Sequence, residues 1–136
     1  MNQPGSVACV LAVVLLPLAA CSPAPAAPLP KVGVSMFSGR PDPSFTLTRE
    51  QADALSSCLK TGRALPHGRL PEGLGFRYFN VAGLEAAPLL VGLDGAWLDQ
   101  GGEPTPVALC ASGFSILRDA AVGALSSDVS AAIPNG

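Results

Sequence analysis

The pattern of apolar and charged side chains divides the chain into an apolar leader, a proline-rich spacer and a mixed domain. No Asp, Glu, Lys or Arg precedes Lys31, and residues 7–20 are almost entirely aliphatic. A helix of that length covers roughly 21 Å, less than the hydrocarbon core of about 30 Å. The run is therefore typical of the apolar region of a signal peptide rather than of a membrane-spanning anchor.

Four prolines in residues 22–30 (SPAPAAPLP) favour a semi-rigid extended spacer with a rise of about 3.1 Å per residue. The small and polar residues 127–136 are typical of a frayed chain end. We therefore predict four segments: a signal peptide over 1–20, a tether over 21–30, one folded domain over 31–126 and a flexible tail over 127–136.

The domain begins with a segment that alternates between apolar and small side chains. Residues 31–37 place Val32, Val34 and Met36 opposite Gly33 and Ser35, which predicts a strand with one buried face. Further extended segments are expected at 45–47, 76–81, 87–93 and 96–99. The last two flank Asp94-Gly95, a signal for a two-residue hairpin turn.

Two segments carry apolar residues at helical spacing. Thr48 and Gln51 have the spacing of a capping box, which predicts a helix over about 49–60 that ends before Gly62. A second apolar stripe predicts a helix over about 115–126. Together the elements predict an α+β domain, with a small antiparallel sheet of three to five strands and two helices packed on one face.

The length of 136 residues fits a single domain after the leader is removed. The formal net charge of −2 lacks the basic footprint that nucleic-acid binding requires, so we predict no nucleic-acid partner.

The apolar leader ends in Leu18-Ala19-Ala20-Cys21, which resembles the lipobox of bacterial lipoproteins. The resemblance implies that the Cys21 thiol receives diacylglycerol and that the chain is cleaved before Cys21. The new amine is then open to acylation. Two or three acyl chains on Cys21 would anchor an exported protein stably to the periplasmic or cell-surface face of a bacterial membrane. The alternative is an ordinary secretory signal in which Cys21 is incidental.

The four cysteines fit the same interpretation. Cys9 lies in the leader and Cys21 would be acylated, which leaves Cys58 and Cys110 in the domain. A remaining pair in an exported chain predicts one disulfide, worth roughly 4 kcal/mol for a loop of about 50 residues. The alternative is two buried, reduced thiols.

Residues 37–45 (FSGRPDPSF) and the following Leu47-Thr48 resemble the S-G-R-P-[ND]-P-x-[WF] motif of small bacterial proteins that have no assigned activity. The resemblance therefore supplies no catalytic residue. Pro41 and Pro43 restrict the loop, so it is a candidate binding loop that presents Arg40 and Asp42. Arg40 would bind a carboxylate or phosphate. The alternative is a rigid connection between elements.

Candidate catalytic and metal-binding chemistry is sparse. His67 is the single histidine, and the chain has neither a Gly-x-Ser-x-Gly motif nor a Cys-x-x-Cys motif. We therefore predict no enzymatic activity, no metal and no cofactor. Trp97 is expected to pack against the sheet, with an exposed ligand platform as the alternative.

The predicted function is a non-enzymatic binding or structural module, lipid-anchored in the bacterial envelope, with an envelope protein or a small ligand as its partner. The alternative is a small secreted hydrolase that uses loop carboxylates. The acidic residues around the predicted hairpin, Glu85, Asp94, Asp99 and Glu103, have a spacing that matches no calcium-binding loop.

Overall fold

The computed structural model of the chain describes residues 25–36, 39–63 and 69–136. The predicted signal peptide, Cys21 and His67 lie outside the described residues.

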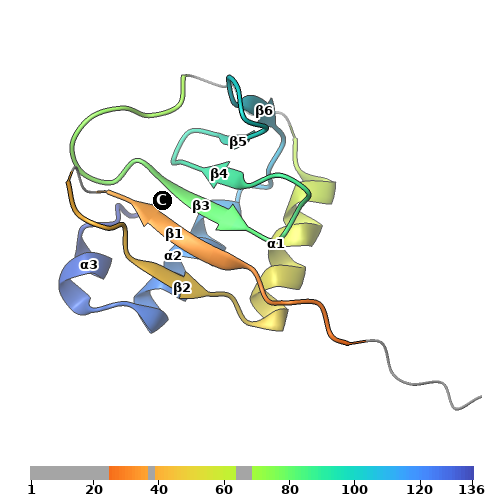
Figure 1. The fold of residues 1–136 in the computed structure, drawn as a ribbon, viewed down its shortest axis with the longest axis horizontal. Coiled ribbons are helices and arrows are strands. Elements are labelled where there is room, and N and C mark those ends of the chain that lie inside the picture. The colour runs from red at the N-terminus through yellow and green to blue at the C-terminus, as the bar shows by residue number, and fades with distance from the viewer. Residues whose placement is uncertain (1–24, 37–38, 64–68) are drawn as a thin grey trace, which may run out of the picture.

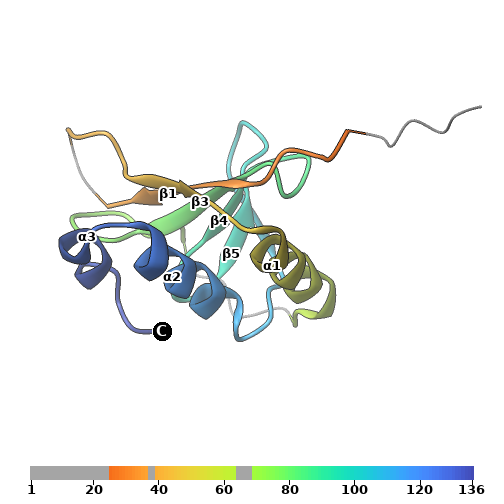
Figure 2. The ribbon, with the colours of Figure 1, turned by 90° about the horizontal axis from the view of Figure 1, so that it is seen from below.

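The described chain forms one antiparallel sheet with its helices on one face (Figures 1 and 2). The strand order is β2-β1-β3-β4-β5-β6. The strands are β1 (Lys31–Ser35), β2 (Ser44–Thr46), β3 (Tyr78–Ala82), β4 (Leu89–Val91), β5 (Ala96–Leu98) and β6 (Thr105–Val107). The helices are α1 (Arg49–Thr61), α2 (Gly113–Ala124) and α3 (Ser127–Ala131). The predicted α+β class is confirmed, and the sheet has six strands where three to five were expected.

The hydrophobic core lies between the inner face of the sheet and the helices. Val32 and Val34 of β1 are fully buried on this face, as the alternation predicted. Phe79 of β3 is also fully buried and packs edge-on against Phe76, with 5.1 Å between ring centroids. Phe114 of α2 completes this aromatic cluster at 5.5 Å from the Phe79 centroid and joins the helix layer to the sheet.

The capping box predicted at the start of α1 is present. The backbone N–H of Gln51 donates to the Thr48 hydroxyl at 3.2 Å, and the backbone N–H of Thr48 donates to the Gln51 side-chain oxygen at 2.9 Å. Because these bonds satisfy amides that the helix leaves unpaired, α1 begins at Arg49 as expected.

The predicted disulfide between Cys58 and Cys110 is confirmed, with 4.9 Å between the two Cα atoms. It joins the last turns of α1 to the segment that precedes α2. Next to it, the Cys110 backbone N–H donates to the Cys58 carbonyl at 3.1 Å. Cys58 is buried, whereas Cys110 is partly exposed.

The prediction of a flexible tail over residues 127–136 was wrong. The tail forms α3, and Ile133 is only 3 % exposed in the core. Arg118 of α2 donates to the side-chain oxygen of Asn135. The tail is ordered because one apolar anchor returns it to the core, which a composition of small and polar residues conceals.

The hairpin between β4 and β5 was placed correctly, but its turn is one residue earlier than expected. The Gly92 N–H donates to the Gly95 carbonyl at 2.9 Å, which puts Leu93 and Asp94 at the tip. Neither tip residue has a positive φ, so the turn is not the type that Asp-Gly favours.

The proline-rich segment and the candidate binding loop lie at opposite ends of β1. Residues 25–29 are exposed and lead into β1 at one end, and the loop of residues 39–43 follows β1 at the other (Figure 1). Within the described residues, no helix has the length and apolarity needed to cross a bilayer.

Candidate functional site: the outer face of the sheet

Arg40 and Asp42, the two candidate binding residues of the loop between β1 and β2, lie in different surroundings. Arg40 is exposed, and within the described residues it makes no hydrogen bond or ion pair. Asp42 accepts a hydrogen bond from the Met36 backbone N–H at 3.4 Å and lines a cavity on the outer face of the sheet. The structure therefore places Asp42, and not Arg40, beside a hollow.

Arg40→Ala should change the free energy of unfolding by less than about 1 kcal/mol, because the side chain is exposed and has no partner among the described residues. Urea unfolding of the variant and the wild type measures this difference. A loss of several kcal/mol would show instead that Arg40 stabilises the fold and would remove it as a binding residue.

The cavity beside Asp42 has a volume of about 390 Å³ and lies over β1 and its two neighbours. We call it the outer trough. It is lined by Lys31, Gly33, Ser35, Asp42, Ser44, Tyr78, Asn80 and Ala82. Its volume falls in the lower part of the range typical of small-molecule sites.

Strand register brings the lining of the outer trough together. Gly33 of β1 pairs with Ser44 of β2 on one side and with Asn80 of β3 on the other. Ser35 pairs with Tyr78. Directly paired residues of antiparallel strands point to the same face, so side chains distant in sequence line one surface.

Tyr78 lines the outer trough and is in contact with Arg77, the residue that precedes β3. The Arg77 guanidinium lies 5.9 Å from the Tyr78 ring centroid, within the range of a cation–π interaction. The Arg77 backbone N–H donates to the Ser35 carbonyl at 2.8 Å, which continues the pairing of β1 and β3 by one residue. The pairing of Ser35 with Tyr78 places the aromatic residue beside Ser35.

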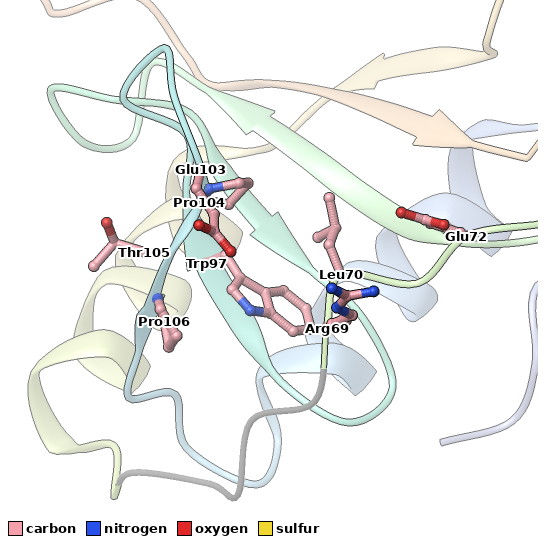
Figure 3. Close-up of a pocket in the computed structure, with 8 residues that line it drawn as sticks. All are labelled: Arg69, Leu70, Glu72, Trp97, Glu103, Pro104, Thr105 and Pro106. Carbon is pink, nitrogen blue, oxygen red and sulfur yellow. The ribbon is translucent and has the colours of Figure 1, made fainter.

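A larger hollow of about 740 Å³ lies at the β6 end of the sheet. In Figure 3 the Trp97 indole lies between the segment that carries Arg69 and Leu70 and the strand that carries Thr105 and Pro106. Trp97 is only 3 % exposed. This burial agrees with the expected packing against the sheet and leaves too little of the ring free for a ligand platform.

The acidic residues around the β4–β5 hairpin do not line one common hollow. Glu103 lines the hollow beside Trp97, and Glu85 lines a separate groove with Lys60. Asp94 is at the hairpin tip, and Asp99 accepts a hydrogen bond from the Gly101 N–H at 3.1 Å. Among the described residues, no three His, Cys, Asp or Glu side chains are grouped so that they could hold a metal ion.

Comparison with known proteins found no family, no curated protein and no solved structure that the chain matches. The site must therefore be judged from its own residues. Sequence reasoning identified Asp42 because it lies in a proline-bounded motif, but it missed Ser35, Tyr78 and Asn80 as site residues. The signal available for them was the polar side of two alternating strands, since Gly33 and Ser35 face away from the core.

Proposed function

We propose that the protein is a lipid-anchored component of the bacterial envelope and acts as a non-enzymatic binding module. The observation that carries the proposal is the Cys58–Cys110 disulfide. Structural disulfides form in oxidising compartments outside the cytoplasm. This bond occupies both cysteines of the folded domain, so Cys21 is the thiol left for acylation once the leader is removed.

The position of the tether supports this arrangement. Residues 25–29 are exposed, and the Arg49 guanidinium donates to the Ala27 carbonyl at 3.1 Å. An anchor at Cys21 would hold the start of β1 toward the lipid surface. The loop of residues 39–43, at the other end of β1 (Figure 1), would then point away from it. The outer trough, which is lined along β1, would lie between the two ends.

The lining of the outer trough supports binding rather than catalysis. Ser35, Ser44 and Asn80 offer hydroxyl and amide groups that donate and accept hydrogen bonds. A serine nucleophile needs an adjacent base held by a third group, and the eight described residues that line the trough offer no such pair of groups beside Ser35 or Ser44. The hydrolase alternative is weaker, because Glu85 and Glu103 line different hollows and Asp94 lies at the opposite end of β4 and β5 from Asp99.

Cys21→Ala should abolish incorporation of a labelled fatty acid and leave the leader uncleaved, because the acylated thiol is the substrate for both steps. The measurement is metabolic labelling with an alkyne fatty acid in a bacterial host, with chain size read on the same gel. Cys9→Ala is the matched control: it replaces the other leader cysteine and should be labelled and cleaved like the wild type. Label retained in Cys21→Ala would contradict the proposal.

A further inference from the structure

We propose that the outer trough is a binding site for a neutral saccharide. The inference deepens the proposed binding role and rests on it. The trough is lined by side chains from β1, β2 and β3 and by Asp42 from the loop between β1 and β2.

The absence of a side chain at Gly33, in the middle of β1, is the first feature that indicates a ligand. Glycine weakens a strand interior by roughly 0.5–1 kcal/mol relative to alanine, so it usually marks a special conformation or a close approach. At Gly33 the pairing with both neighbouring strands is regular and φ is not positive. A Cβ atom built there would meet nothing within 4 Å. The missing side chain therefore serves no packing or turn, and its effect is to keep the floor of the trough open.

The functional groups around this floor determine the class of ligand. Ser35, Ser44 and Tyr78 contribute hydroxyls and Asn80 an amide, all of which can both donate and accept hydrogen bonds. Such groups match the hydroxyls of a sugar, and the Tyr78 ring adds a flat apolar wall.

The charges of the trough favour an uncharged occupant. Lys31 and Asp42 supply one basic and one acidic side chain to the lining, so its formal charges cancel. They lie toward opposite ends of β1, because Lys31 begins the strand and Asp42 follows it in the loop. A neutral ligand meets no repulsion at either end, whereas a phosphate would be repelled near Asp42 and a polycation near Lys31.

The middle of the trough offers no free backbone edge to a peptide that binds as an added strand. β1 is paired along both edges, with β2 on one side and β3 on the other. β2 is the edge strand of the sheet, but a strand added to its free edge would extend the sheet sideways and would not lie over β1 and β3. Recognition over the middle of the trough therefore comes from side chains, as for a saccharide.

The test is equilibrium dialysis of the full-length, detergent-solubilised protein against radiolabelled maltotriose and N,N′,N″-triacetylchitotriose. Tetra-alanine, a zwitterionic peptide, is the comparison ligand. We expect one of the trisaccharides to bind and tetra-alanine not to bind. Gly33→Val should weaken saccharide binding by about tenfold or more, because it fills the open floor with a side chain that a strand accommodates.

Gly102→Ala is the matched control, since a Cβ atom there also meets nothing within 4 Å but the residue is not part of the trough. It should bind the saccharide like the wild type. Asn80→Ala supplies a second variant if Gly33→Val does not fold, and it should weaken binding by removing the amide. The inference is overturned if neither trisaccharide binds, if tetra-alanine binds instead, or if the folded trough variants bind as the wild type does. None of these results would affect the labelling of Cys21, so the two proposals fail separately.

Discussion

Removal of the Cys58–Cys110 disulfide should lower the free energy of unfolding by about 4 kcal/mol. The bond closes a loop between residues that are 52 positions apart, and in the chain-entropy model most of its effect comes from restricting the unfolded chain. Cys58→Ala, Cys110→Ala and the double variant should be compared with the wild type by urea unfolding. The double variant should lose no more than the larger single loss, because each substitution already removes the whole bond.

Alkylation of the native, exported protein without reductant provides the independent check. We expect neither Cys58 nor Cys110 to react. Reaction of both thiols, or stability unchanged in the single variants, would contradict the structure and remove the main support for export.

Gly62→Ala should lower the free energy of unfolding by about 3 kcal/mol, because the added methyl group does not fit at the end of α1. An alanine Cβ would lie 2.6–2.7 Å from the backbone N, Cα and C atoms of Leu109. These atoms cannot rotate aside, and the chain is held there by the Arg63–Leu109 bridge and by the disulfide at the next residue. The φ of −62° at Gly62 suits alanine, so the expected loss comes from the contact alone.

Gly123→Ala is the matched control for this prediction. Gly123 lies within α2, and a Cβ atom there would meet nothing within 4 Å. Because alanine is the better helix former, this variant should be more stable than the wild type, by up to about 1 kcal/mol. Equal stability of Gly62→Ala and the wild type in urea would show that α1 and Leu109 are not in close contact.

The elements that the sequence predicted well are those encoded by neighbouring residues. The capping box at Thr48 and the alternation around Val32 and Val34 are local patterns, and both appear as expected. β6 was missed because its three residues include Pro106, which is tolerated there at the edge of the sheet. The tail was misjudged because its order depends on Ile133, whose burial is a tertiary contact.

The candidate site was predictable only in part, for a related reason. Asp42 was found because prolines on both sides mark its loop. Tyr78 and Asn80 are more than 40 positions away from β1, and only the register of β1 with β3 places them beside Ser35 and Gly33. A pattern along one strand shows which residues share a face, but it does not show which strand pairs with it.

Export of the domain and its anchoring through Cys21 can be tested by mass spectrometry of the protein extracted from bacterial membranes. This measurement identifies both the N-terminal residue and its modification. We expect an N-terminal Cys21 that carries a diacylglyceryl group on its thiol. A mature chain that begins at another residue, or that contains Cys21 with an unmodified thiol, would contradict it.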